Sequence, residues 1–333
     1  MTIAQEVPAR AGEGLTTITA PGPAQLVLMA AVARRYYLDN RSKVEIAEEF
    51  SLSRFKVARL LEDARSTGLV RIEIGQPGGI DLDLSIRLRD RFRLQHAIVV
   101  DTLEEDDVLL RRQVGRAAAD LLSEIVTVQD VLGLGWARSL VEMCACLTTL
   151  AQCPVVQLTG ALSRPDVDES SIDLVRDVAR ITRAPASYFY APMILPDATT
   201  AAALRRQPEV AHAMGQYACV TKAVVGLGSW APPHSTVYDA ITPAEREALV
   251  GLGVRADISG VLLDEQGQVV PAGLTERMVC IDAAALHRVP EVIALVYGAA
   301  KAGAARAAVS GGYVDSLVTH SGLARAMLAE VEA

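Results

Sequence analysis

Four residues in the first quarter of the chain are of types that contact nucleic acid. They follow Ser53, whose side chain can cap a helix, in the stretch SRFKVARLLEDA. Val57, Leu60 and Leu61 recur there at helical spacing and predict one buried stripe. A helix with cations in its first turns can reach phosphates and base edges in the major groove of DNA. The candidate DNA contacts at the start of this helix are therefore Ser53, Arg54, Phe55, Lys56 and Arg59.

A second helix is predicted just before this one. Ser42 and Glu45 have the spacing of a capping box, which predicts a helix over residues 43–50. The two residues 51–52 leave room only for a turn. Ser42 and Lys43, at the helix start, join the candidate DNA contacts. The apolar residues of this helix are expected to be Val44, Ala47 and Phe50.

A first helix and a final strand complete the pattern. Met29, Val32, Ala33 and Tyr36 predict a helix that packs on the other two, and residues 69–74 alternate like a strand after Gly68. Three short helices followed by a strand are typical of a winged helix-turn-helix domain. The alternative is a helical hairpin with charged, solvated faces, which such spacing alone also produces.

The charge distribution favours DNA contact in this segment only. Of the chain's 32 Lys and Arg and 40 Asp and Glu, residues 1–74 hold 10 and 9, a net charge of +1. The rest of the chain therefore carries −9, and phosphate would repel it. This acidity argues against a histone-like or non-specific binder.

The length of 333 residues predicts two domains, because a single core rarely keeps growing to this size. We expect a poorly ordered tail at 1–22, a winged helix-turn-helix DNA-binding domain at 23–75, a linker and connecting helix at 76–95, and a larger domain at 96–333. No apolar run of about 20 residues and no signal peptide is apparent. A soluble, cytoplasmic protein without membrane contact is therefore expected.

The larger domain has the texture of an α/β fold. Residues 81–94, after the linker GQPGG, predict a connecting helix with Leu82, Ile86 and Leu94 on its apolar side. Runs rich in Val, Ile and Leu then lie between helical segments, at 96–100, 131–134, 155–158, 224–227 and 292–296. Such runs without alternation indicate a mostly parallel, Rossmann-like sheet with helices on both faces. Ligands of these sheets bind outside the carboxyl ends of the strands.

Glycines follow four of these predicted strands. They occur in GLGWARS after residue 132, in TGA at 159–161, in GLGSW at 226–230, and at Gly298, which precedes Lys301. A glycine-rich turn into a helix, with Arg138 and Ser139 at its start, favours an anion such as a phosphate. It is not the dinucleotide fingerprint, because the third glycine is missing. Any single loop of this kind is more often structural, since tight turns need glycine anyway.

The cysteines do not predict a metal or redox site. Their number is odd and they lack the paired spacing of a zinc site, so buried, reduced thiols are expected. Two of them fall in a predicted apolar helix over residues 139–150. No metal and no cofactor is expected. The five are Cys144, Cys146, Cys153, Cys219 and Cys280.

The motifs together resemble the SorC family of sugar-sensing transcriptional regulators. The resemblance covers the chain from about Leu26 onward. It rests on the ordered series SRFKVARLLEDARSTGLVRIEI, GLGWARSL, VVQLTGAL, YFYAP, VVGLGSW, GVRADISGVLLDEQGQ and VIALVYGAAKAGAARAAVSGGYVDSLVTH. It implies a winged helix-turn-helix joined to a domain similar to glucosamine-6-phosphate deaminase and ribose-5-phosphate isomerase. It also implies a homodimer or homotetramer that responds to a sugar or sugar phosphate.

The resemblance also implies an effector-binding site. The aspartate of GVRADISG would accept hydrogen bonds from sugar hydroxyls, and the lysine of YGAAK would place a cation at the ligand. The chain departs from the family pattern at Ala137, Ala256 and His320. The implied effector-binding residues are Gly135, Trp136, Arg138, Ser139, Gly160, Ala161, Asp257 and Lys301.

Two classes of function remain open. The first is an effector-controlled regulator that binds double-stranded operator DNA of a carbohydrate or polyol catabolic operon. The second is a sugar-phosphate isomerase or deaminase with an appended DNA-binding domain. An enzyme needs a positioned acid and base, and a Schiff base at Lys301 is a third chemistry. The acid–base candidates, which do not cluster in the sequence, are Asp257, Asp264, Glu276, His287 and His320.

Overall fold

The computed structural model of this protein describes residues 22–71, 79–103, 106–162 and 169–329. These residues form two compact units that divide after Gly75. The expected tail lies outside the described residues, except for Gly22, which caps the first helix. Most of the expected linker, residues 75–78, lies outside them as well.

The N-terminal unit contains three helices, as the sequence predicts: α1 (Pro23–Tyr37), α2 (Lys43–Glu49) and α3 (Arg54–Ser66). The capping box at Ser42 and Glu45 is present, and the Ser53 hydroxyl accepts a hydrogen bond from the Lys56 N–H. Each cap satisfies N–H groups that a helix start leaves without a partner. The core of the unit is made by Met29, Val32, Ala33, Ile46, Ala47, Val57, Leu60, Leu61 and Ala64.

Two expectations for this unit were wrong in detail. Val44 is exposed, because Ile46 and Ala47 form the buried face of α2. Residues 69–71 are not a strand: the Val70 N–H donates to the Ala64 carbonyl and closes the end of α3 instead. The rest of the predicted strand, residues 72–74, lies outside the described residues.

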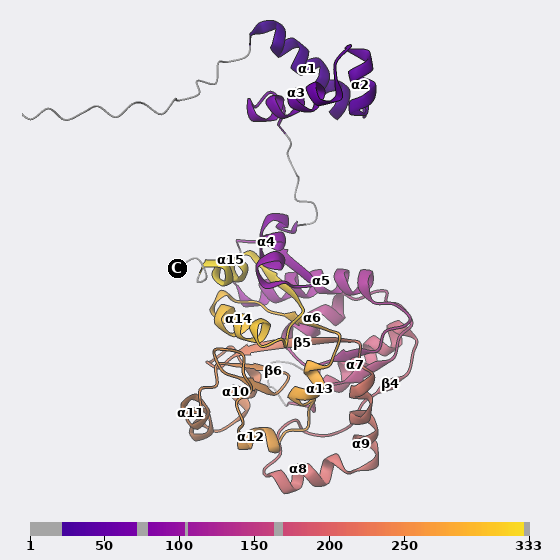
Figure 1. The fold of residues 1–333 in the computed structure, drawn as a ribbon. Coiled ribbons are helices and arrows are strands. Elements are labelled where there is room, and N and C mark those ends of the chain that lie inside the picture. Colours follow the sequence, from indigo (N-terminus) through magenta and orange to yellow (C-terminus); the bar gives the residue numbers. More distant parts are fainter. Residues whose placement is uncertain (1–21, 72–78, 104–105, 163–168, 330–333) are drawn as a thin grey trace, which may run out of the picture. The chain divides into compact units, whose positions relative to one another are not determined.

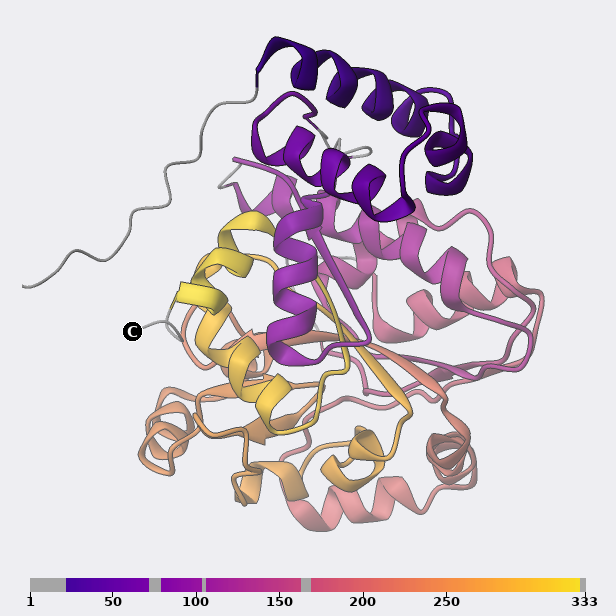
Figure 2. The same ribbon diagram turned by 45° about the horizontal axis from the view of Figure 1, so that its top comes forward.

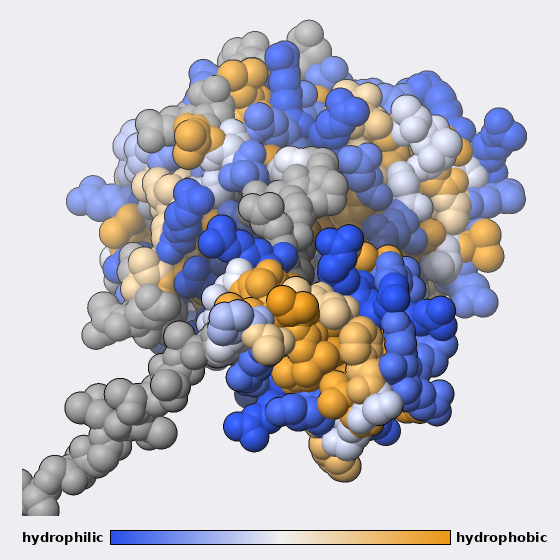
Figure 3. All heavy atoms as spheres, turned by 90° about the horizontal axis from the view of Figure 1, so that it is seen from above, coloured by the Kyte–Doolittle hydropathy of each residue, from blue (hydrophilic) through white to orange (hydrophobic). Residues whose placement is uncertain are grey.

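In Figure 3 the apolar surface gathers near the start of α1, the helix on which Val27 is exposed.

The larger unit is built on a sheet that is mostly parallel, as expected. Its strands run in the order β1-β9-β8-β5-β2-β3-β4, all parallel, and an antiparallel hairpin of β6 and β7 extends from the end of β5. The strands are β1 (His96–Val100), β2 (Leu132–Leu134), β3 (Val155–Gln157), β4 (Ala186–Ser187), β5 (Lys222–Ser229), β6 (Ala256–Ile258), β7 (Val261–Leu263), β8 (Glu291–Leu295) and β9 (Ser316–His320).

Helices cover both faces of this sheet. One face packs on α5 (Asp107–Ile125), α6 (Arg138–Cys146) and α7 (Ser171–Thr182). The other packs on α4 (Leu82–Phe92), α13 (Ala283–His287), α14 (Ala302–Ser310) and α15 (Ser321–Ala329). Figures 1 and 2 show α4 next to the yellow helix α15, which in turn packs on α14. The strands are therefore buried from both sides, which explains their continuous apolar sequence.

Short elements lie between the strands in the chain and complete the larger unit. They are α8 (Ala198–Arg205), α9 (Pro208–Gly215), η2 (Gln216–Cys219), α10 (Thr236–Ala240), α11 (Pro243–Gly251), α12 (Gly273–Glu276) and η3 (Ala299–Lys301). Two satellite clusters, separate from the main cores, pack in this region. Their side chains hold the loops that follow the strands.

Three details of this unit differ from expectation. Ile86 is exposed, because α4 packs its Leu84 and Leu88 into the core of the larger unit instead. Helix α6 ends at Cys146, since Leu147 adopts an extended backbone. Cys146 and Cys219 are exposed, so only part of the buried-thiol expectation holds.

No helix in the described ranges is long and apolar enough to cross a membrane. Within the same residues no group of three or more His, Cys, Asp or Glu side chains is placed to hold a metal ion.

Candidate functional site

A cavity opens where four neighbouring strands of the sheet end. Its walls come from the loops after β2, β3, β5 and β8 and from the β6–β7 hairpin. After β2 the next strand of the sheet, β3, is added on one side, and after β5 the next, β8, is added on the other side. The order of strands therefore reverses between β2 and β5, and the cavity lies at this point. The residues that line the cavity include Trp136, Ala137, Arg138, Ser139, Thr159, Gly160, Met193, Gly226, Gly228, His234, Asp257, Ser259, Tyr297 and Lys301.

The start of α6 forms one wall. Its N-cap is Ala137, whose methyl side chain cannot accept a hydrogen bond from the first N–H groups of α6. A Cβ on Gly226 would lie 2.2 Å from the Ala137 methyl carbon, too close for both to be present. Gly226 thus makes room for the alanine that replaces a common family glycine. The helix start stays open toward the cavity, where Arg138 adds a positive charge.

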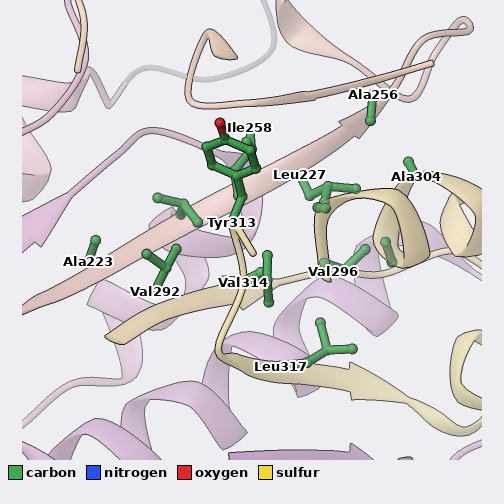
Figure 4. Packing of buried hydrophobic residues seen from close by; sticks show 14 of the residues in the cluster. Ala223, Leu227, Ala256, Ile258, Val292, Val296, Ala304, Tyr313, Val314 and Leu317 are labelled. Carbon is green, nitrogen blue, oxygen red and sulfur yellow. The ribbon is translucent and has the colours of Figure 1, made fainter. Parts of the chain in front are cut away.

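Asp257 projects into the cavity because of the alternation of β6. Its neighbours Ala256 and Ile258 point into the hydrophobic core behind the sheet (Figure 4), so Asp257 faces the other way. Gly228 lies directly opposite on β5, and a Cβ there would meet the Asp257 carboxylate at 2.2 Å. The Ser235 hydroxyl donates a hydrogen bond to the same carboxylate. Ala256, another departure from the family pattern, is therefore a core residue.

Lys301 supplies a buried cation at the end of η3. Its Nζ donates a hydrogen bond to the Leu227 carbonyl at 3.3 Å and lies 4.6 Å from the centre of the Tyr297 ring. Burial lowers the pKa of Lys301 to about 8, and the charge of Asp257 opposes this shift. Burial raises the pKa of Asp257 to about 6, against the effects of Ser235 and Lys301. The two side chains thus place opposite charges inside one largely desolvated cavity.

The buried carboxyl of Asp257 predicts a pH-dependent stability. Its pKa is higher in the folded protein than the usual 3.8, so the stability that its proton contributes is present at low pH and lost as pH rises through about 6. In Asp257→Asn this loss is absent. Between pH 4 and pH 7, the free energy of unfolding of wild type is expected to fall relative to the variant by on the order of 2 kcal/mol. Urea unfolding at several pH values measures it, and a constant difference between the two proteins would contradict it.

Thr159 brings an unused hydrogen-bonding group to the opposite wall. Its hydroxyl is fully buried and has no hydrogen-bond partner within the described residues. A buried polar group without a partner is unfavourable unless a ligand or water satisfies it. Two other lining groups are already engaged: the Trp136 indole N–H donates to the Glu169 carbonyl, and the Ser139 hydroxyl donates to the Leu295 carbonyl.

The structure brings most of the residues that the family resemblance implies for effector binding to this one cavity. Trp136, Arg138, Ser139, Gly160, Asp257 and Lys301 line it. Gly135 and Ala161 do not line it: Gly135 is buried beneath Ser259, and Ala161 forms backbone hydrogen bonds with residues 191 and 193.

Several lining residues were not predicted from the sequence, notably Met193, His234, Ser259 and Tyr297. Ser259 has a positive φ of 51° in the β6–β7 turn, which no residue pattern signalled. Met193 comes from a segment without regular structure, and only the tertiary fold carries it to the cavity.

His320 lies in a second, adjoining cavity. It ends β9, is buried, and has a backbone N–H close to each ring nitrogen, from Gly298 and Gly322. Burial lowers its pKa, and the charge of Asp107 opposes the shift. A neutral ring accepts only one such bond at a time. The side chain is therefore held by the backbone of the two loops beside it, which fits a structural histidine.

The candidate DNA contacts of the N-terminal unit are exposed at the start of α3. Arg35, Arg41 and Arg65 of the same unit form ion pairs with neighbouring acids. Within the described residues, by contrast, none of the cations of α3's first turns forms an ion pair or a side-chain hydrogen bond. These available cations, together with one apolar side chain, are Arg54, Phe55, Lys56 and Arg59.

The remaining candidates at the helix starts have structural roles as well. The hydroxyls of Ser42 and Ser53 accept backbone hydrogen bonds as N-caps, but each still has a proton to donate. The ammonium of Lys43 lies 5.7 Å from the centre of the Tyr36 ring.

A sequence comparison assigns the larger unit to a family of sugar-binding domains, whose model matches residues 79–329. Among curated proteins, the chain is 27% identical over 303 residues to an uncharacterised transcriptional regulator, YjhU of Escherichia coli, covering 88% of this chain and 92% of that protein. It is 26% identical over 317 residues to the transcriptional regulator LsrR of E. coli, covering 94% and 98%.

Solved structures with a similar fold are also regulators. The full-length sorbitol operon regulator SorC from Klebsiella pneumoniae matches with a TM-score of 0.69 at 22% identity, covering 91% of this chain and 98% of that one. A DeoR family transcriptional regulator from Listeria monocytogenes matches with a TM-score of 0.66 at 22% identity, covering 74% and 99%. At this identity the structural likeness concerns the fold.

Proposed function

This chain belongs to the sugar-binding domain family of SorC-type transcriptional regulators, and we propose that it is a DNA-binding regulator of a carbohydrate or polyol catabolic operon. The observation that carries the proposal is one cavity with an uncapped helix start, a buried lysine and a buried aspartate. The same chain carries a helix-turn-helix unit with exposed cations that form no ion pair among the residues that the structure describes. Sensing and DNA binding thus have separate places in one molecule.

The effector we infer is a sugar or polyol, or its phosphate. The start of α6 with Arg138, and the ammonium of Lys301, suit the oxygens of a phosphate. The carboxylate of Asp257 and the unpartnered hydroxyl of Thr159 suit sugar hydroxyls, which donate and accept hydrogen bonds. We infer that no metal or cofactor takes part.

A role as a sugar-phosphate isomerase or deaminase is the alternative, and the geometry supports it less. Of the acid–base candidates from the sequence, Asp257 lines the cavity, while Asp264, Glu276, His287 and His320 do not. His234 does line it, so a histidine and an aspartate are both present there. Turnover of aldose or ketose phosphates by the purified protein would favour the enzyme.

We further propose that the protein acts in the cytoplasm, where the operator is accessible, as a homodimer or homotetramer. One recognition helix makes few base contacts, so specific binding to double-stranded DNA requires two such helices, spaced by about a helical turn or a multiple of it. An effector alters operator affinity only if it binds one arrangement of the subunits better than another.

The test of this function is a reciprocal titration. Calorimetry with a panel of sugars, polyols and their phosphates is expected to find one effector. A saturating operator duplex should then change its affinity by the same factor, about 5- to 150-fold, by which the effector changes operator affinity. An operator affinity that the bound effector leaves unaltered would rule the coupling out. Light scattering that finds a monomer would rule out the oligomer.

A further inference from the structure

Phe55 is the most exposed large apolar side chain that the structure describes in the N-terminal unit. It is 88% exposed, at the second residue of α3. The core of this unit is closed without it, because α3 buries Val57, Leu60 and Leu61 on another side. Covering an apolar ring removes its surface from water, so a partner that binds the start of α3 gains stability from contact with Phe55.

The surroundings of Phe55 select the kind of occupant. Arg59 lies one turn further along the same face of α3, and Arg54 and Lys56 flank the ring in sequence. All three cations are exposed and form no ion pair within the described residues. A lone apolar ring among available cations fits a polyanion that also presents an apolar group. DNA has this combination in its major groove, where thymine alone among the four bases carries a methyl group at C5.

We propose that Phe55 contacts the C5-methyl group of a thymine in each half of the operator. The proposal rests on the DNA-binding function above and names one base that it reads. The N-cap at Ser53 fixes the start of the helix, so the ring is presented by a rigid element. The cations hold the helix to the phosphates, and Phe55 distinguishes thymine from cytosine at one position.

The test uses operator duplexes selected by the full-length protein from a random library. Each thymine is replaced singly by deoxyuridine, which keeps every hydrogen-bonding group and lacks only the methyl. The wild-type protein is expected to lose about three- to tenfold in affinity at one position in each half-site, the value of one buried methyl group. Phe55→Ala is expected to bind the two duplexes equally.

Two controls isolate the contact. Leu38→Ala removes another exposed apolar side chain of the same unit, 65% exposed, and should keep the preference for thymine. Cytosine at the same position should weaken binding. For the wild-type protein, 5-methylcytosine should restore part of the lost affinity, whereas for Phe55→Ala it should restore none. Phe55→Ala should retain wild-type effector affinity, which reports an intact fold.

The outcomes separate this inference from the proposed function. If wild type selects an operator but tolerates deoxyuridine at every position, or if Phe55→Ala keeps the same preference for thymine, the contact is wrong and the regulator stands. The same holds if Phe55→Ala leaves DNA binding unaltered, as expected for a ring that docks another protein. If no sequence is selected at all, both proposals are overturned.

Discussion

Replacing Arg54, Lys56 and Arg59 together by Ala is expected to reduce operator affinity at least 100-fold at about 0.1 M salt. The three side chains are exposed at the start of α3 and have no ion-pair partner within the described residues. Each phosphate contact releases a counterion on binding, so the slope of log affinity against log salt should become shallower by about two to three units if all three touch phosphates. If one of the three contacts a base, its loss should instead reduce the discrimination between operator sequences.

A matched variant controls for the change in net charge. Arg87, Arg89 and Arg91 lie on the exposed side of α4 in the larger unit, and their triple replacement by Ala removes the same charge. This variant should keep the operator affinity to within about twofold, because its three arginines are not on the proposed DNA-reading helix and salt screens the attraction of net charge alone. Equal losses in both triple variants, or an unaltered affinity in the first, would mean that α3 is not the DNA-reading helix.

Lys301→Met is expected to weaken binding of a phosphorylated effector by about 100-fold or more. The ammonium is buried and faces the cavity, and removing one partner of a desolvated charge pair costs on the order of 3 kcal/mol. Methionine keeps the length of the side chain without its charge. The loss should be much smaller for the unphosphorylated sugar, so calorimetry with both ligands reports where the phosphate lies.

The pH dependence provides a second check on the same lysine. Because burial places the pKa of Lys301 at about 8, its positive charge is lost as pH rises from 7 to 9. Affinity of wild type for an anionic effector should fall over this range, while the residual affinity of Lys301→Met should not follow it. Lys43→Met, which removes a lysine of the N-terminal unit, should bind effector like wild type. Equal effector binding by wild type and Lys301→Met would place the ligand elsewhere.

Much of the fold is written in local patterns. The caps at Ser42 and Ser53 and the stripe through Leu60 predict α2 and α3, because capping and helical periodicity depend on residues three or four apart. The five runs of branched residues predict β1, β2, β3, β5 and β8 for a similar reason, since a strand buried on both faces needs a continuous apolar sequence. The short edge strand β4 and the strand β9 were missed, as was the β6–β7 hairpin.

Errors arose where a neighbour in space decides which side of an element is buried. Ile86 was expected in the core, but α4 turns Leu84 and Leu88 toward the sheet and leaves Ile86 in water. In the same manner α2 buries Ile46 and leaves Val44 exposed. Several apolar residues on one helix allow more than one buried face, and only the packing partner selects among them.

The candidate site divides along the same line. The sequence by itself determined that glycine-rich turns follow buried parallel strands, and these turns meet at one edge because parallel strands all end there. The family resemblance added Asp257 and Lys301. Only the tertiary structure decided that Asp257 lies over Gly228, that Gly226 makes room for Ala137, and that His234, Ser259 and Tyr297 complete the walls. These contacts join residues far apart in the chain, and their register depends on how the β6–β7 hairpin pairs with β5, which no local spacing encodes.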